Sequence, residues 1–206
     1  MNIVNDFRQL PRVKGTRGDP HGTRPVHDVV GITLHQTATR DFSPHHSGLA
    51  SVPAHAMVHR DGSVSLLHEP LSIVWHGNAL NGGTIGIEIA CRAAGTEGDA
   101  STFWISKGER KRGATFEQLV SEATDDQLQG AYDLCRWYVE GVSKMGGAIR
   151  GIWAHRQGHW SRTSDPGSRI WKRVAEAVRL DVGLADVRDK VLGTGKPIPM
   201  EWRSER

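Results

Sequence analysis

Histidines and an aspartate next to short apolar segments are the residues of this 206-residue chain best suited to chemistry. His155 ends the apolar run Gly151–Ala154, and Asp165 follows on a turn shaped by Pro166 and Gly167. A strand that fixes an imidazole and a short loop that returns a carboxylate bring two ligands of a tetrahedral cation together. The sequence therefore predicts a metal site at this point of the chain.

The third ligand must come from another segment. His35 is the best donor, because it ends a second apolar run, Val29–Leu34. We expect His35, His155 and Asp165 to bind one Zn²⁺, which leaves a position for water and lowers the pKa of that water toward about 7. His159 stands four residues after His155, a spacing that also suits zinc, so it is an alternative to Asp165. Its other reading is a loop residue at the rim of the cleft.

A zinc hydrolase also needs a group that takes a proton from the attacking water. Glu88 is predicted to be this catalytic base, because alternation along Thr84–Cys91 places it opposite its isoleucine neighbours. The other interpretation of Glu88 is a salt-bridged residue of the sheet. His76 has two readings, substrate contact and structural hydrogen bonding. Arg162 and Thr163 are further candidates for substrate binding or oxyanion stabilisation.

These side chains need a sheet and helices to hold them. Apolar and β-branched runs predict strands at 29–35, 54–60, 63–68, 84–91 and 150–155. The Asp61-Gly62 pair predicts a hairpin turn between the second and third of these strands. Capping signals and helical spacing predict helices at about 125–145 and 168–182, with Trp171 in the core. The fold class is α/β, with a central mixed sheet flanked by helices.

One domain is expected, with an N-terminal arm at 1–28, the main body at 29–183 and a charged surface tail at 184–206. Within the body, 92–122 is interpreted as an inserted, solvated loop that carries the basic run Lys107–Arg112. Cys91 and Cys135 lack metal-ligand spacing and are predicted to be buried thiols.

The charge balance bears on partners. With 26 basic and 23 acidic residues the formal charge is +3, too small and too evenly spread to indicate nucleic acid. The chain shows no run of membrane-spanning length and no secretory signal pattern, so we expect a monomer made in the cytoplasm, without a membrane partner.

Six short motifs together resemble the type-2 N-acetylmuramoyl-L-alanine amidases, which include phage endolysins and cytosolic anhydro-muropeptide amidases and are related to peptidoglycan recognition proteins. They span about 29–180 in the family's order: Ile32–Ala38, His55–Gly62, Trp75–Gly77, Thr84–Glu88, Ala154–Arg156 and Ser164–Gly167. The resemblance implies an amidase-like fold, zinc bound by His35, His155 and Asp165, and Glu88 as the base. It also implies peptidoglycan or muropeptides as the partner.

The implied reaction cleaves the amide between the lactyl group of N-acetylmuramic acid and L-alanine of the stem peptide. A phage-type endolysin that acts on the cell wall is expected; a cytosolic recycling amidase and a non-catalytic peptidoglycan-binding module are the alternatives. Two departures from the family pattern matter. Thr163 stands where members often have lysine, with Arg162 or His76 as substitutes, and Ala54 stands where some phage members have a catalytic tyrosine.

Overall fold

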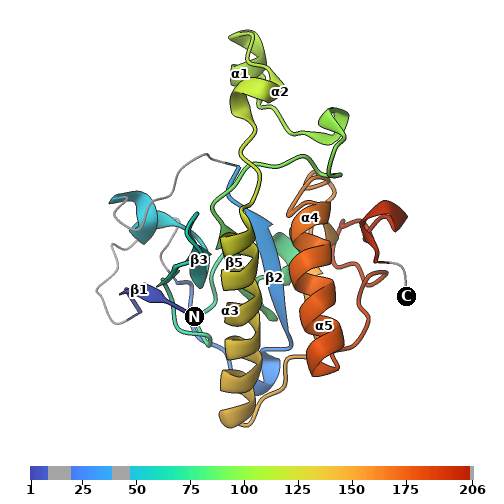
Figure 1. Ribbon diagram of the computed structural model, residues 1–206. Helices are drawn as coiled ribbons and strands as arrows, with labels where there is room; N and C mark the ends of the chain where they lie inside the picture. Colours follow the sequence, from blue (N-terminus) through green and yellow to red (C-terminus); the bar gives the residue numbers. More distant parts are fainter. Residues whose placement is uncertain (9–19, 39–46, 205–206) are drawn as a thin grey trace.

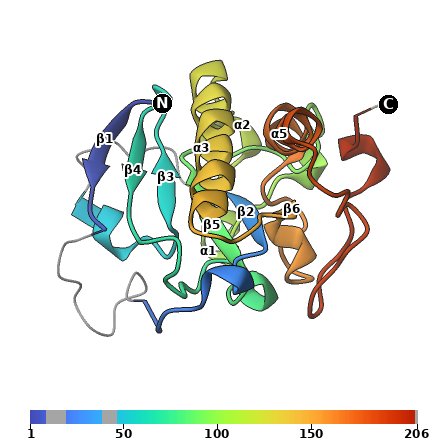
Figure 2. The same cartoon turned by 90° about the horizontal axis from the view of Figure 1, so that it is seen from below.

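A six-stranded mixed sheet forms the centre of the molecule, described in a computed structural model at residues 1–8, 20–38 and 47–204. Its strand order is β1-β4-β3-β5-β2-β6, seen edge to edge in Figure 2. The β3 and β4 strands pair antiparallel and all other neighbours pair parallel. The strands are β1 (Ile3–Asp6), β2 (Gly31–Gln36), β3 (Ala56–Val58), β4 (Val64–Leu66), β5 (Thr84–Ile89) and β6 (Gly151–Ala154).

Two long helices cover one face of this sheet (Figure 1). The first, α3 (Asp125–Lys144), starts at the predicted capping box, where Thr124 and Gln127 satisfy each other's backbone N–H groups. The second runs without a break through α4 (Ser168–Ile170), a π-helical turn (Trp171–Glu176) and α5 (Ala177–Val182). It ends at Gly183, whose φ of 71° lies in the left-handed region that glycine tolerates.

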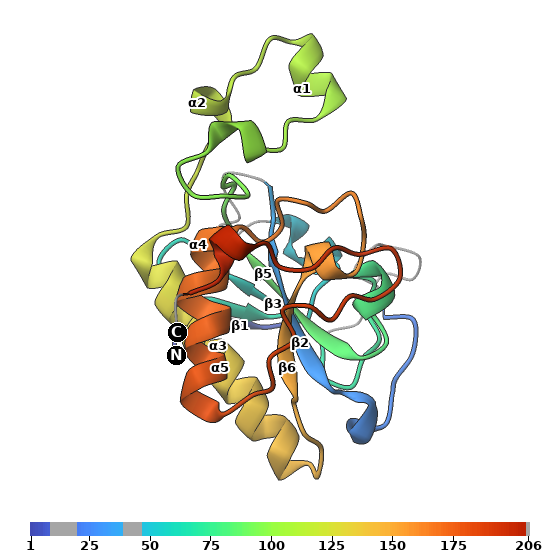
Figure 3. The ribbon, with the colours of Figure 1, turned by 90° about the vertical axis from the view of Figure 1, so that its right-hand side faces the viewer.

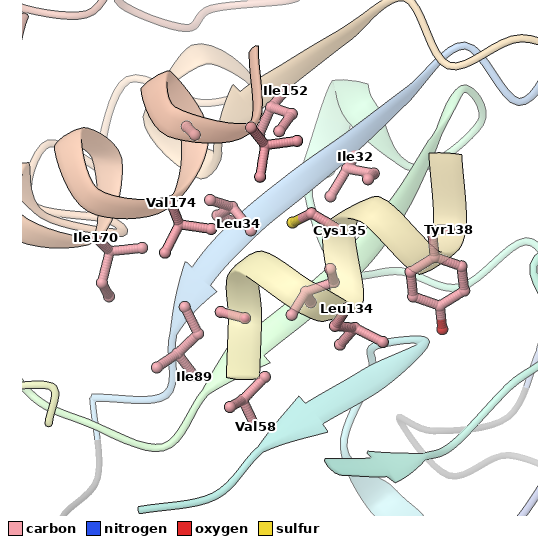
Figure 4. Packing of buried hydrophobic residues seen from close by; sticks show 14 of the residues in the cluster. Ile32, Leu34, Val58, Ile89, Leu134, Cys135, Tyr138, Ile152, Ile170 and Val174 are labelled. Carbon is pink, nitrogen blue, oxygen red and sulfur yellow. The ribbon is translucent and has the colours of Figure 1, made fainter. Parts of the chain in front are cut away.

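The apolar core lies between the helices and this face of the sheet (Figure 4). Residues at alternate strand positions, such as Ile32, Leu34 and Ile87, point into it and are fully buried. Trp171 is 2% exposed, which confirms its predicted place in the core, and Cys91 and Cys135 are buried free thiols as expected. The intervening positions, including Thr33, His35 and Glu88, therefore face the opposite side of the sheet.

The predicted hairpin is confirmed at β3 and β4. Gly62 takes a φ of 77°, and the Asp61 carboxylate accepts hydrogen bonds from the backbone N–H and the hydroxyl of Ser63. Of the loop expected after β2, residues 39–46 lie outside the described residues, and Ser47–Ser51 forms a short 3₁₀ helix.

The segment predicted to be an N-terminal arm contributes to the sheet. Ile3–Asp6 is the edge strand β1, paired in parallel with β4. No strand is predicted there from the sequence, because four residues without apolar alternation form a strand only when a neighbouring strand supplies hydrogen bonds. Residues 9–19 of the expected arm lie outside the described part of the chain.

The insertion, residues 92–122, is not the structureless loop that we predicted. It contains α1 (Lys107–Lys111) and α2 (Phe116–Leu119), each begun by a capping box. Its two ends are joined by a β-bridge between Arg92 and Ser121. Figure 3 shows the insertion extending well beyond the body of the molecule.

The tail after residue 183 was predicted to be a surface extension; most of its described residues are exposed, but the prediction is wrong where single side chains are buried against the body. Ile198, Trp202 and Val187 are at most 3% exposed. The apolar residues of the tail are too widely spaced for a helix or strand pattern. Their burial, each packed singly against the body, was therefore not predicted from the sequence.

Among the helices in the described ranges, none is both long enough and apolar enough to cross a membrane.

Two glycines of α3 provide a test of how closely this helix approaches the hairpin. A Cβ at Gly130 would lie 2.3 Å from the carbonyl oxygen of Gly62, whereas a Cβ at Gly141 would meet nothing within 4 Å. Gly130→Ala should therefore lower the free energy of unfolding by about 1–3 kcal/mol. Gly141→Ala, the matched control, should raise it by about 0.5–1 kcal/mol through helix propensity. Urea unfolding measures both, and a stabilising Gly130→Ala would contradict this packing.

Candidate metal and substrate site

The carboxyl ends of three parallel strands bring the predicted site residues together. His35 lies near the end of β2, next to Glu88 of β5 in the sheet register. His155 directly follows β6, which pairs with β2 on its other side. Because parallel strands end at the same edge of a sheet, residues distant in sequence meet there.

His35, His155 and Asp165 form the one group of metal-ligand type found among the described residues. The Nδ1 atoms of the two histidines are 2.9 Å apart, and Asp165 Oδ2 lies 3.0 Å from His155 Nδ1 and 3.9 Å from His35 Nδ1. Two ligands of a tetrahedral ion with bonds of about 2.0–2.1 Å lie about 3.3 Å apart, so these separations bracket the spacing that a metal needs.

The hydrogen bonds of His35 determine which nitrogen faces this group. His76 donates from Nε2 to the carbonyl oxygen of Thr84 at 3.1 Å, which leaves its Nδ1 as an acceptor. His35 Nε2, 3.0 Å from that Nδ1, must then carry the proton. The Nδ1 atom of His35 therefore presents a lone pair to the group.

His155 is fixed in the same tautomer by Asn78. The side-chain oxygen of Asn78 lies 2.9 Å from His155 Nε2 and can only accept, so Nε2 is protonated and Nδ1 presents a lone pair. Asn78 itself has a φ of 58°, a left-handed conformation that asparagine tolerates better than most residues.

Gln36 holds the third ligand residue in place. Its backbone N–H donates to Asp165 Oδ1 at 2.9 Å, which leaves Oδ2 directed at the histidines. Its side-chain amide donates to the carbonyl oxygen of Ser164 and accepts from Ala93 N–H. Gln36 thus ties the loop that carries Asp165 to the strand that carries His35.

The electrostatics of the group suit a cation. Burial, together with the neighbouring His155, lowers the pKa of His35 to about 4, so its imidazole is neutral at physiological pH. Burial raises the pKa of Asp165, but the two adjacent imidazoles outweigh this effect and leave the pKa below its usual range. Two imidazoles and a carboxylate that converge on one point fit a divalent metal ion. That they bind zinc stays a prediction.

His76 lies on the pocket wall, and its hydrogen bonds favour the structural reading over that of a substrate contact. The side chain is 5% exposed and both ring nitrogens are engaged. A Cβ at residue 86 would lie 2.4 Å from its ring, so Gly86 provides the space in which the ring sits. His76 orients His35 and has no free N–H for an oxyanion.

Glu88 lies beside the group with one oxygen unsatisfied. Its Oε2 is buried and, within the described structure, has no hydrogen-bond partner. Burial raises the pKa of the carboxyl to about 8, with the nearby Asp165 carboxylate acting in the same direction and Arg162 opposing. A carboxyl with a pKa near neutrality can both accept and donate a proton, as an acid–base catalyst must.

A pocket of about 670 Å³ opens over these residues. Glu88, His155 and Asp165 lie on its wall, as do Arg162 and Thr163, both of which are exposed. Trp75 is also on the wall; it is 64% exposed, and its ring stacks on that of His21 with the ring centres 4.1 Å apart. A pocket of this size with convergent polar groups is typical of a ligand site.

His159 lies outside the metal-ligand group. Its Nδ1 lies 2.8 Å from the hydroxyl of Ser161, within its own loop. This supports the reading of His159 as a loop residue and leaves Asp165 as the better third ligand.

Sequence reasoning missed the residues that orient the ligands from outside the group. Arg24 is one of them: its buried guanidinium donates to the carbonyl oxygens of Thr84, Pro70 and Asn81. The Thr84 carbonyl that accepts from His76 is thereby held from two sides. Asn78 and Gln36 were visible only as polar neighbours of apolar runs, and no sequence signal pointed to Arg24.

The tail braces the loop that follows His155. The buried side chain of Gln157 donates to the carbonyl oxygens of Val187 and Lys190 and accepts from Ala154 N–H. In the same region, the Arg156 guanidinium lies 4.8 Å from the ring centre of Trp202. The tail thus supports the peptide that carries a ligand residue.

Three solved structures share this fold. They are an endolysin N-acetylmuramoyl-L-alanine amidase, LysCS, from Clostridium intestinale URNW (TM-score 0.52, 13% identity, 89% of this chain and 99% of that chain covered); wild-type PGRP-LB from Drosophila (0.51, 11%, 84% and 92%); and peptidoglycan recognition protein-LE in complex with tracheal cytotoxin (0.50, 15%, 83% and 89%). Among curated protein sequences, none matches this chain.

The sheet, its helices and the pocket at the strand ends define a fold shared by wall amidases and peptidoglycan recognition proteins. A family model described as N-acetylmuramoyl-L-alanine amidase matches residues 25–168, which is more than half of the chain. The chain belongs to this family, and the resemblance seen in its six sequence motifs is confirmed.

Glu88→Gln tests the electrostatics of the site in chelator-treated protein. The pKa of Glu88 is about 8 in the folded state and 4.5 ordinarily. Between these two pH values the folded state keeps a proton that the unfolded state loses. Wild-type stability must then fall as pH rises, because deprotonation favours unfolding. Since glutamine does not ionise, we expect nearly equal urea midpoints at about pH 4, below both pKa values, and an advantage for the variant of about 2–4 kcal/mol at about pH 9. Parallel pH profiles for the two proteins would contradict the raised pKa.

Proposed function

We propose that the protein is a zinc-dependent N-acetylmuramoyl-L-alanine amidase. Its substrate is the amide between the lactyl group of N-acetylmuramic acid and L-alanine of the stem peptide. The observation that carries the proposal is the convergence of three lone pairs, from His35, His155 and Asp165, beside Glu88 in the pocket of an amidase-family chain.

His35, His155 and Asp165 would hold the zinc ion. Bound there, zinc would supply a Lewis acid for the scissile carbonyl and lower the pKa of a water molecule toward about 7. The donor set agrees with this role, because hydrogen bonds on the far nitrogens of both histidines leave Nδ1 as the nitrogen that faces Asp165.

Glu88 is proposed as the general base and then the general acid. Its carboxylate takes a proton from the attacking water and returns it to the alanine nitrogen as the C–N bond breaks. The raised pKa and the unsatisfied Oε2 support this assignment. No tyrosine is needed for this route, which agrees with Ala54 at the position where some members have one.

Arg162 is proposed to supply the positive charge that family members often obtain from lysine two residues before the last ligand. Thr163 occupies that position, and the exposed Arg162 beside it lines the pocket. Its guanidinium can bind the oxyanion or a carboxylate of the stem peptide. His76 cannot take this part, because both of its nitrogens are engaged.

For the biological role, we propose lysis of the wall by an endolysin-type enzyme. The fold shared with an endolysin supports this role but does not distinguish it from recycling of soluble muropeptides. A binding module that does not cut remains the rival class, since the fold is also that of a recognition protein bound to tracheal cytotoxin.

Product analysis tests the reaction. Purified protein with zinc should release free stem peptides from intact peptidoglycan, and chelator should abolish the release. Glu88→Gln should retain zinc but lose about 10²–10⁴-fold in rate, because the proton acceptor is gone. Mass spectrometry of the products gives the bond cleaved, and zinc-loaded protein without any cleavage would favour the binding module.

Asn78→Gly tests how the ligands are held. Glycine keeps the left-handed backbone conformation and removes only the acceptor for His155 Nε2, so zinc affinity should fall about 10–100-fold. The matched variant Asn78→Asp keeps an acceptor oxygen and should bind zinc at least as tightly as the wild type. Competition with a chromogenic chelator measures both, and unchanged affinity in the glycine variant would refute the role of this hydrogen bond.

A further inference from the structure

The insertion carries a cluster of positive charge on the part that projects from the body (Figure 3). Lys107, Arg110, Lys111 and Arg112, here called the basic cluster, are all exposed. In the described residues, none of the four forms an ion pair. Four cations within six residues repel one another, so the cluster has no stabilising role of its own.

The acidic residues of the insertion do not neutralise this cluster. Glu109 accepts two hydrogen bonds from Arg92, and Glu97 pairs with Arg169 of the body. Asp99 accepts from the N–H and the hydroxyl of Ser101. Residues 92–122 as a whole carry five basic and five acidic residues, but within 105–119 the four cations of the cluster face only Glu109 and Glu117, so a positive excess remains around α1.

Hydrogen bonds join the base of the insertion to the rim of the site. The Ser164 hydroxyl, next to Asp165, donates to the carbonyl oxygen of Thr102 at 2.5 Å. Trp202 of the tail donates from its ring to the Thr96 hydroxyl at 3.1 Å. These contacts fix the insertion to the segments that also hold the ligands.

Trp104 and Arg92 connect the pocket wall to α1, which carries the basic cluster. Trp104 lies on the pocket wall with 52% of its surface exposed, and α1 begins three residues later at Lys107. Arg92 lies on the same wall and donates both to the Trp104 carbonyl and to Glu109 of α1. A chain-like ligand that leaves the pocket past Trp104 would therefore reach the basic cluster.

We propose that the insertion is a docking surface for polymeric peptidoglycan, and that carboxylates of stem peptides flanking the one in the pocket pair with the basic cluster. This inference rests on the proposed function, because it takes the pocket to hold one stem peptide of the wall. Each exposed pair contributes little, but several repeated along one strand act together and raise the rate of association. A soluble single muropeptide lacks the flanking stems and gains nothing from the insertion.

The test compares two variants of equal charge. The cluster variant carries Lys107→Gln, Arg110→Gln, Lys111→Gln and Arg112→Gln. The control variant carries Arg136→Gln, Lys144→Gln, Lys172→Gln and Arg173→Gln, four exposed residues of the helical face that do not line the pocket. Both changes are combined with Glu88→Gln, so that binding to purified sacculi can be measured by co-sedimentation without digestion. Thermal unfolding checks that each variant is folded.

We expect the cluster variant to bind sacculi about tenfold more weakly than its parent at low salt, and the control variant to bind within about twofold. The difference should vanish near 1 M salt, where the screening length is about 3 Å. Equal binding by the cluster variant and its parent, or an equal loss in the control variant, overturns the proposal.

Modified sacculi identify the anionic group. Binding should survive removal of phosphate-bearing accessory polymers and should fall when stem-peptide carboxyls are amidated. The reverse result, or tight binding to anionic lipid vesicles with none to sacculi, overturns the proposal in favour of another partner.

Turnover of a soluble muropeptide, measured with Glu88 intact, separates this inference from the proposed function. The cluster variant should cleave it within about twofold of wild type, since the cluster does not line the pocket. If the wild type fails to cleave it and fails on sacculi, the amidase proposal falls while the binding result stands by itself. If the wild type cleaves the muropeptide normally and the cluster variant binds sacculi as tightly as its parent, only the docking-surface proposal is refuted.

Discussion

The site depends on two hydrogen bonds that point away from it. Asn78 and His76 each accept a hydrogen bond from the Nε2–H of one candidate ligand, and the Thr84 carbonyl fixes His76 as an acceptor. Both Nδ1 lone pairs therefore face Asp165 at close range. Without a cation or a shared proton, three such electron-rich atoms would repel one another. The surrounding structure must therefore hold them together in advance, which reduces the reorganisation needed when a metal binds.

The two faces of the sheet differ in composition, which allows the site residues to be held in place beside an apolar core. One face is apolar and packs under α3 and α5 (Figure 4), which provides the stability. The other face carries buried polar groups, most of them satisfied by specific partners, with Gly86 leaving space for the His76 ring. Since the strand alternation separates the two kinds of residue, the chemistry does not interrupt the core.

Two segments beyond the sheet complete the site from opposite sides. The insertion contacts the loop before Asp165, and the tail contacts the loop after His155. Trp202 joins the two segments through Thr96. The ligand loops are thus supported by contacts from both segments.

The sequence by itself determined the elements whose signals are local. Alternating apolar residues, the Asp61-Gly62 turn and the capping box at Thr124 gave the main strands, the hairpin and α3, and strand-end positions gave the three candidate ligands and Glu88. Only the tertiary structure decided β1, the burial of the tail and the orienting role of His76. It also supplied Asn78 and Gln36, whose partners lie 77 and 129 residues away in the chain. The reason is physical: a helix or turn forms from contacts between near neighbours, whereas a tautomer or an edge strand is fixed by whichever distant segment folding places beside it.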